Sequence, residues 1–151
     1  MAKEIERKFL INAVKIDLTE YPSVEIQQGY LSDYMEPCVR IRIADNNAFL
    51  TVKGRNYGNT RDEFEYQIPM EDASVIMSMC GYNTLFKTRY LVGRWEVDVF
   101  HRNHLGLIIA EIELKSEDEK INLPDWIGEE VSNNPEYFNF NLIFDDNHGD
   151  K

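Results

Sequence analysis

The sequence predicts a mainly β fold of the α+β class, in which antiparallel strands are numerous enough to close a small barrel and helices are few. Charged and apolar residues alternate with a period of two in many short segments. Turn-forming clusters such as Asp45-Asn46-Asn47 separate these segments. The length of 151 residues fits one hydrophobic core, so we expect a single domain over residues 1–151.

The predicted strands are the segments in which this alternation is clearest. They cover residues 3–10, 26–32, 38–44, 48–54, 62–69, 84–91, 94–101 and 107–115. Two other segments favour helices. The first runs from Asp72, as its N-cap, to Cys80, where Gly81 would end it, and the second begins near Pro135. We expect both helices to pack against the outside of the barrel.

The composition excludes several classes of partner. A net charge of −11 argues against non-specific binding of nucleic acid, which requires a basic surface. The sequence has no apolar stretch long enough to cross a bilayer, so no membrane partner is expected. The first residues lack the apolar core of a secretory signal, and Cys38 and Cys80 lack the spacing of a metal finger. These features predict a cytoplasmic protein with reduced cysteines.

Charged residues on the predicted strands gather on one face in like-signed pairs. In the first strand Glu4, Glu6 and Lys8 share a face, because alternate side chains of a strand point the same way. The same-face pairs that follow are Arg40 with Arg42, Thr51 with Lys53, Glu63 with Glu65, Lys87 with Arg89, Glu96 with Asp98, and Glu111 with Glu113. The opposite face of these strands is apolar or aromatic.

A solvated outer face over an apolar core is the usual meaning of such alternation. Like-signed pairing argues against it here, because an exposed face is more stable with mixed charges. Clustered carboxylates suit Mg²⁺ or Mn²⁺, and clustered arginine and lysine suit phosphate oxygens. The pattern therefore indicates a site for a metal-bridged polyphosphate, although strand parity alone does not decide whether the charged face points inward.

These residues resemble the CYTH superfamily, the triphosphate tunnel metalloenzymes. The family's N-terminal ExExK signature appears as Glu4-Ile5-Glu6-Arg7-Lys8. The other matching elements are Gln28-Gly29-Tyr30-Leu31, Arg40 and Arg42 as RxR, Thr51 and Lys53 as TxK, the later pairs on the charged face, Glu130-Val131-Ser132, and Tyr137-Phe138-Asn139-Phe140-Asn141-Leu142 as YxNxxL. The resemblance covers nearly the whole chain and is greatest to short bacterial inorganic triphosphatases.

The resemblance implies a closed eight-stranded antiparallel β-barrel with a triphosphate tunnel, which would turn the charged face inward. Mg²⁺ or Mn²⁺ would then be held by Glu4, Glu6, Glu63, Glu65, Asp98, Glu111 and Glu113. The phosphates would be bound by Lys8, Arg40, Arg42, Lys53, Lys87 and Arg89. Lys8 and Tyr30 would form a catalytic pair that helps to activate water. A lysine acts as a base only if its neighbours lower its pKa.

The implied activity is metal-dependent hydrolysis of inorganic tripolyphosphate to pyrophosphate and phosphate. Relatives in the family often pair, which implies a homodimer. Three alternatives remain open from the sequence: a thiamine triphosphatase, an adenylate cyclase of the class IV type, and a non-catalytic module that binds polyphosphate or nucleotide.

Overall fold

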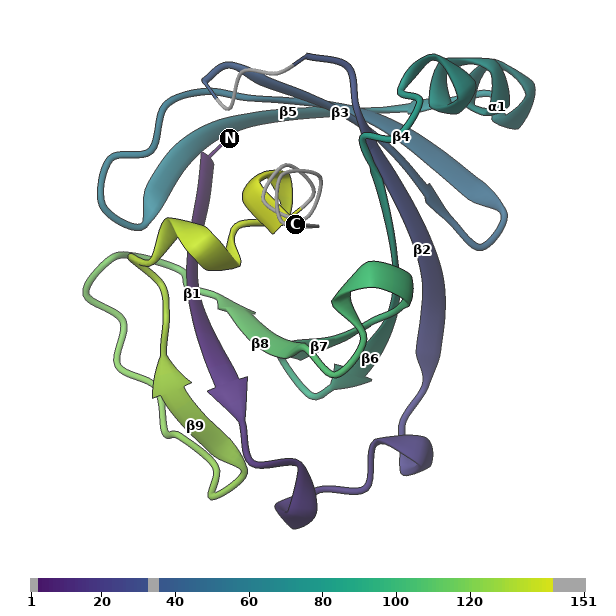
Figure 1. Ribbon diagram of the computed structural model, residues 1–151. Helices are drawn as coiled ribbons and strands as arrows, with labels where there is room; N and C mark the ends of the chain where they lie inside the picture. The colour runs from purple at the N-terminus through teal and green to yellow at the C-terminus, as the bar shows by residue number, and fades with distance from the viewer. Residues whose placement is uncertain (1–2, 33–35, 143–151) are drawn as a thin grey trace.

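The structure is a computed structural model that describes residues 3–32 and 36–142. Within these residues nine antiparallel strands form one sheet in the order β5-β4-β3-β2-β6-β7-β8-β1-β9. The strands are β1 (Lys3–Ile11), β2 (Ser23–Tyr30), β3 (Cys38–Ala44), β4 (Asn47–Lys53), β5 (Thr60–Ile68), β6 (Thr84–Val92), β7 (Trp95–Phe100), β8 (Ile108–Glu113) and β9 (Ile127–Glu130). Strand β1 also pairs with β5, and this pairing closes the first eight strands into a barrel (Figure 1).

Strand β1 closes the barrel and also recruits the ninth strand. Its first residues pair with β5, from Lys3↔Asp62 to Ile5↔Thr60, while its other edge pairs with β8. Because β5 covers only the first residues of its edge of β1, the C-terminal part of β1 remains available and pairs with β9. The eight-stranded barrel expected from the sequence is confirmed. Strand β9 was not predicted, because Ile127–Glu130 is short and shows no clear alternation.

Most predicted strand boundaries lie close to the observed ones, and β3 matches its prediction. The largest difference is in β2, which begins at Ser23 rather than at residue 26. Ser23 and Val24 pair with Tyr90 and Arg89 of β6, so the long partner strand extends β2 beyond its own alternating segment. Pairing between strands thus outweighs local pattern at this end.

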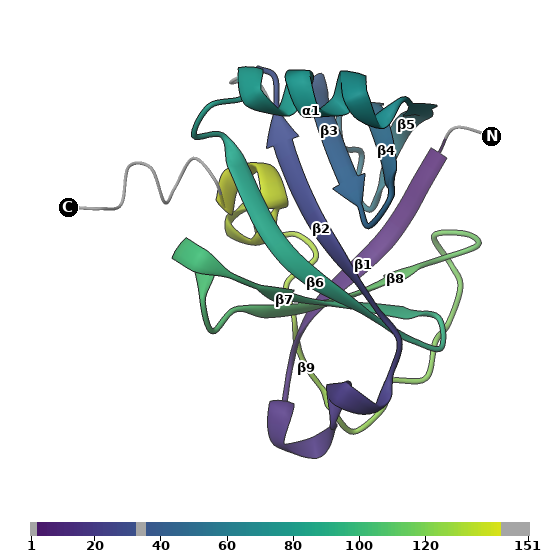
Figure 2. The ribbon, with the colours of Figure 1, turned by 90° about the vertical axis from the view of Figure 1, so that its right-hand side faces the viewer.

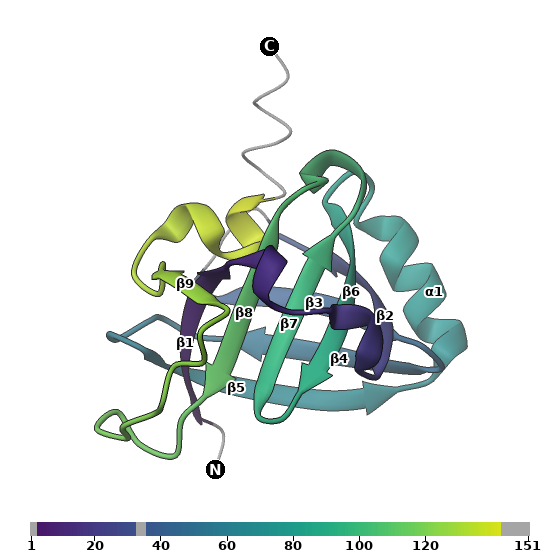
Figure 3. The same cartoon turned by 90° about the horizontal axis from the view of Figure 1, so that it is seen from below.

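The hydrophobic core lies largely outside the ring of strands. One cluster places Phe9 and Trp95 edge to face, with ring centroids 5.5 Å apart, and Trp126 packs on Trp95 in the same way. Figure 3 shows β9 and α1 (Met70–Met79) on opposite outer sides of the barrel. The apolar face of the strands is therefore covered from outside, which leaves the charged face to line the interior.

Helix α1 packs outside the barrel, as predicted, but begins earlier than expected. Its N-cap is Pro69, whose carbonyl accepts a hydrogen bond from the amide of Ala73, and not Asp72. Asp72 instead lies in the first turn, where its negative charge favours the helix dipole. The helix ends at Met79 with Cys80 as its C-cap. Gly81 follows with a positive φ of 59°, the backbone conformation that often ends a helix.

The second predicted helix does form, but its expected place outside the barrel is wrong. A 3₁₀ turn at Pro135–Tyr137 is followed by a helical turn at residues 139–142. Phe140 packs edge to face on the buried ring of Tyr30, with centroids 5.4 Å apart. This apolar contact draws the segment over one end of the barrel (Figures 1 and 2).

Among the helices that the structure describes, none has the length and hydrophobicity needed to span a membrane.

Close packing of α1 on the barrel predicts that Gly29→Ala destabilises the protein. A Cβ at Gly29 would lie 2.7 Å from Sγ of Cys80 and 2.8 Å from Sδ of Met77, so α1 would have to shift. We expect a loss of roughly 1–3 kcal/mol in the free energy of unfolding, measured by urea denaturation. Gly54→Ala is the control, because its Cβ would meet Asp62 at an ordinary 3.6 Å. Equal losses in the two variants would contradict this packing.

Candidate active site in the barrel interior

The barrel encloses a cavity of about 350 Å³ that is lined mainly by charged side chains. Every site residue predicted from the sequence lines it except Asp98. The charged face of the strands therefore points inward. The wall also includes residues that the sequence reasoning did not assign to the site, namely Cys38, Asn56, Asn59, Arg61, Arg94, Glu96, Phe138, Asn139 and Phe140. Of these, Cys38, Arg94 and Glu96 share the strand parity of predicted site residues and could have been found from the alternation.

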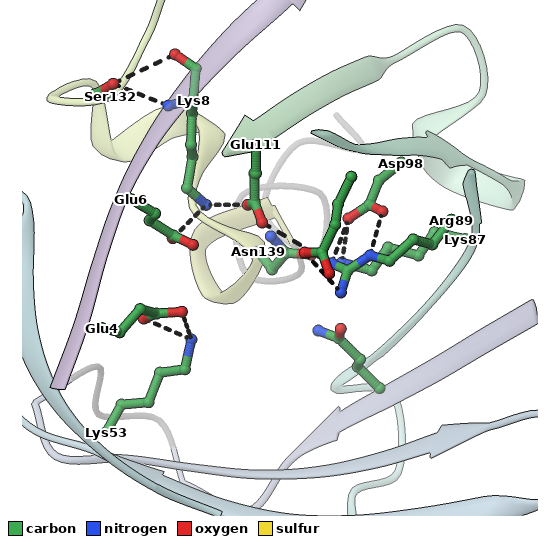
Figure 4. Close-up of polar contacts among 12 residues, drawn as sticks. Glu4, Glu6, Lys8, Lys53, Lys87, Arg89, Asp98, Glu111, Ser132 and Asn139 are labelled. Atoms are coloured by element: carbon green, nitrogen blue, oxygen red, sulfur yellow. Dashed lines mark hydrogen bonds and ion pairs between the residues drawn. The ribbon is translucent and has the colours of Figure 1, made fainter. Parts of the chain in front are cut away.

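The acidic part of the site is built by β1 and β8. These strands pair in the register Lys8↔Glu111 and Glu6↔Glu113, so their acids project side by side. Nζ of Lys8 forms an ion pair with Oε2 of Glu111 at 2.9 Å and lies 3.8 Å from Oε1 of Glu6 (Figure 4). Burial, together with the nearby Glu111 and Glu4, raises the pKa of Glu6 to about 8. Glu6 is thus a carboxyl group crowded by like charges, which a bound cation would stabilise.

Lys8 lies among acids, and its electrostatics differ from what a general base requires. Burial lowers the pKa of Lys8, but the carboxylates of Glu111 and Glu6 outweigh burial and hold the pKa above its usual range. The shift is therefore opposite to the lowered pKa that a lysine base requires. Tyr30 lines the same cavity, and its hydroxyl accepts a hydrogen bond from Nε2 of Gln28 at 3.2 Å. Lys8 and Tyr30 thus contact different partners here.

The basic part of the site comes from β3, β4 and β6. Arg40 donates to Oγ1 of Thr51 at 3.2 Å and lies 3.5 Å from Glu65. Nζ of Lys53 lies 3.2 Å from Glu4 (Figure 4). Arg42 differs from both of these cations, because its hydrogen-bond partner is the neutral amide oxygen of Gln28. Burial, with Arg40 and Arg89 nearby, outweighs the opposing effect of Asp98 and lowers the pKa of Arg42 to about 10.

Asp98 lies behind the cavity wall and is fully engaged by two cations. Nε and Nη2 of Arg89 donate to its two oxygens at 2.8 and 2.9 Å, and Nζ of Lys87 lies 2.6 Å from Oδ2 (Figure 4). Burial raises the pKa of Asp98, but Lys87 and Arg89 outweigh burial and lower it. In this arrangement Asp98 holds the two cations in place and does not present an oxygen to the cavity.

The remaining predicted metal ligands do not converge in this structure. Within residues 3–32 and 36–142, no group of three or more acidic, histidine or cysteine side chains gathers where an ion would fit. The ion pairs explain this, because Glu111 is drawn to Lys8 and Glu4 to Lys53. The donor chemistry still suits a hard cation, since Glu4, Glu6, Glu111 and Glu113 supply only carboxylate oxygens to one region of the wall.

Comparison with known proteins gives consistent matches along the chain. The model of the CYTH domain family matches residues 2–142. An inorganic triphosphatase of Acetivibrio thermocellus is 40% identical over 152 residues, which cover 95% of this chain and 94% of that protein. An inorganic triphosphatase of Nitrosomonas europaea is 33% identical over 147 residues, covering 90% of this chain and 93% of that protein.

Solved structures extend the comparison to three dimensions. A crystal structure of an inorganic triphosphatase aligns with a TM-score of 0.67 at 31% identity, covering 93% of this chain and 97% of that chain. A protein from Pyrococcus horikoshii aligns with a TM-score of 0.57 at 18% identity, covering 76% of this chain and 80% of that chain. At the lower identity the likeness concerns the fold alone.

The raised pKa of Glu6 predicts that Glu6→Gln stabilises the metal-free protein at high pH. The folded state keeps this proton up to about pH 8, whereas the unfolded chain loses it near 4.5, so the stability due to Glu6 falls as pH rises between these values. We expect Glu6→Gln to raise Tm at pH 8.5 by roughly 2–4 °C for each kcal/mol gained. The gain should shrink toward zero at pH 5. The exposed Glu129→Gln variant is the control, and a gain of equal size at both pH values would contradict the assignment.

The buried ion pairs of Asp98 predict that Asp98→Asn is strongly destabilising. The substitution leaves the buried cations of Lys87 and Arg89 without their counter-charge, so we expect a loss of about 3–5 kcal/mol at pH 7 in urea denaturation. Asp62→Asn is the matched control, because Asp62 pairs with Lys3 at 2.6 Å on the surface. Its expected loss is about 0–1 kcal/mol. A similar small loss for Asp98→Asn would show that this network contributes little to stability.

Proposed function

Because the chain belongs to the CYTH family, we propose that it is a metal-dependent triphosphatase that hydrolyses inorganic tripolyphosphate to pyrophosphate and phosphate. The two curated relatives that bear the name inorganic triphosphatase support this reading, since each aligns with nearly the whole chain. A charged tunnel with both acidic and basic walls also suits a substrate that carries several negative charges and divalent cations.

The unfavourable electrostatic environment of Arg42 is the observation that carries this proposal. Its guanidinium lies close to Arg40 and Arg89, and among residues 3–32 and 36–142 its hydrogen-bond partner is a neutral amide oxygen, so its charged form is disfavoured. A phosphate chain would supply the missing negative charge and would accept from the remaining N–H groups of the fork. The acids around Glu6 form the opposite case, because they gain from a bound cation.

The residues that would hold Mg²⁺ or Mn²⁺ are Glu4, Glu6, Glu111 and Glu113, with Glu63 or Glu65 from β5, which pairs with β1. When bound, such an ion supplies charge neutralisation at the phosphate oxygens. The choice among these carboxylates depends on the ion pairs with Lys8 and Lys53, which have to loosen before the acids can converge.

The chain's own residues would act mainly by positioning and by electrostatic stabilisation. Arg40, Arg42 and Arg89 would hold phosphate oxygens, and their guanidinium groups would stabilise the charge that moves to the leaving oxygen. While Glu111 and Glu6 lie beside it, the pKa of Lys8 is raised, so Lys8 would act as a charged donor at Nζ to a phosphate oxygen. It would act as a base only if these acids turned away from it to hold the metal. The hydroxyl of Tyr30 would donate from the opposite wall of the tunnel.

The first test is phosphate release from tripolyphosphate, ATP and thiamine triphosphate by metal-stripped protein, with Mg²⁺ or Mn²⁺ added back. We expect metal-dependent release that is fastest with tripolyphosphate. Arg42→Ala should lower kcat/KM by about 10- to 100-fold, because it removes charged hydrogen bonds to the phosphates. Arg55→Ala is the control, since Arg55 lies on the surface and pairs with Glu36.

Three results would overturn the proposal in different ways. A cyclic product from ATP would favour the cyclase, and fastest release from thiamine triphosphate would favour the thiamine triphosphatase. Tight binding of tripolyphosphate without release would leave a binding module.

A further inference from the structure

The ammonium group of Lys87 lies where the cavity meets the segment that covers the end of the barrel. Lys87 comes from β6, and its side chain is only 1% exposed. Its Nζ lies 2.6 Å from Oδ2 of Asp98 and donates to Oδ1 of Asn139 at 2.8 Å (Figure 4). Asn139 belongs to the helical turn at residues 139–142 and also lines the cavity. One amide therefore joins the covering segment to a phosphate-binding candidate.

The two acceptors on Lys87 have different chemical consequences. Asp98 is shared, because Arg89 donates to both of its oxygens at 2.8 and 2.9 Å. Asn139 is neutral, so its oxygen orients the ammonium group without cancelling the positive charge. An ammonium group has three protons, and two acceptors leave one of them for a ligand. Lys87 is thus oriented by its neighbours. Burial, with Arg89 and Arg42 nearby, outweighs Asp98 and lowers the pKa of Lys87 to about 7, so a bound anion would favour its ammonium form.

The segment that carries Asn139 is anchored independently of Lys87. Asn134 caps the 3₁₀ turn through the amide of Glu136, and the amide of Leu142 donates to the carbonyl of Phe138 at 2.9 Å. Phe140 and Leu142 are buried against the barrel. The amide oxygen of Asn139 is therefore presented from a fixed backbone, as a positioning group requires.

We propose that Asn139 is a positioning residue, whose amide oxygen directs the ammonium group of Lys87 toward the phosphate chain in the tunnel. This inference rests on the proposed triphosphatase function. A purely structural alternative is that Asn139 only packs the covering segment onto the barrel. The two roles differ in one respect: the positioning effect needs Lys87, and the packing effect does not.

A double-mutant cycle with Lys87 separates these roles. Asn139→Leu keeps most of the side-chain volume but removes the acceptor, and we expect kcat/KM for tripolyphosphate to fall by about 10- to 100-fold. Asn139→Asp keeps an acceptor oxygen and should retain more activity than Asn139→Leu. In a Lys87→Met background, Asn139→Leu should change kcat/KM by less than about twofold, because the group that it positions is gone. Asn133→Leu, at an exposed position before the 3₁₀ turn, should match the parent protein.

The proposal is overturned if Asn139→Leu behaves like the parent protein, or if its loss is equally large in the Lys87→Met background. Thermal melting of each variant shows whether the barrel is folded at the assay temperature. The affinity for tripolyphosphate in the presence of Mg²⁺, measured by calorimetry, tests the same dependence of Asn139→Leu on Lys87 without relying on hydrolysis. If the parent protein binds tripolyphosphate but does not hydrolyse it, the proposed triphosphatase function is overturned, and the double-mutant cycle can still be measured through binding affinity. If the parent protein neither binds nor hydrolyses tripolyphosphate, both proposals are overturned.

Discussion

The short seam between β1 and β5 is the contact on which the closed barrel depends. Backbone pairing there covers only Lys3 to Ile5, yet it turns an open sheet into a tunnel. Side-chain ion pairs reinforce the seam on both faces. Lys3 contacts Asp62 on the outside at 2.6 Å, and Glu4 contacts Lys53 on the inside at 3.2 Å. The inner pair joins the acidic and basic walls, so closure and the electrostatics of the site depend on the same residues.

The interior shows a conflict between stability and binding. A pair such as Lys8 and Glu111 offsets part of the cost of burying two charges, whereas burial and like-charged neighbours disfavour the charged forms of Arg42 and Glu6. Such groups raise the affinity for a ligand that brings both phosphate and metal, because binding relieves repulsion of both signs. The apolar clusters outside the ring of strands, together with the one under the covering segment, supply the stability that the charged interior lacks.

Much of the fold and of the cavity wall could be predicted from the sequence because strands alternate with a fixed period. Arg40, Arg42 and the pair Glu111 and Glu113 lie inside because each shares the parity of its strand. Strand parity predicted the same inward position for Asp98. Asp98 lies behind the cavity wall because it pairs with Lys87 and Arg89, and parity does not reveal such pairing. The inward position of the segment at residues 135–142 was also missed, because it is set by long-range packing of Phe140 on Tyr30.

Three of the buried cations have a neutral hydrogen-bond acceptor that orients them without adding negative charge to the interior. Gln28 accepts from Arg42, Thr51 accepts from Arg40, and Asn139 accepts from Lys87. Arg40 and Lys87 also contact the acids Glu65 and Asp98, so further acids in these three places would cancel more of the charge that a phosphate needs. Amide and hydroxyl oxygens fix direction at a smaller electrostatic cost to the ligand. Because two of these acceptors lie on strands and the third lies on the covering segment, the geometry of the phosphate site depends on the barrel and on its cover together.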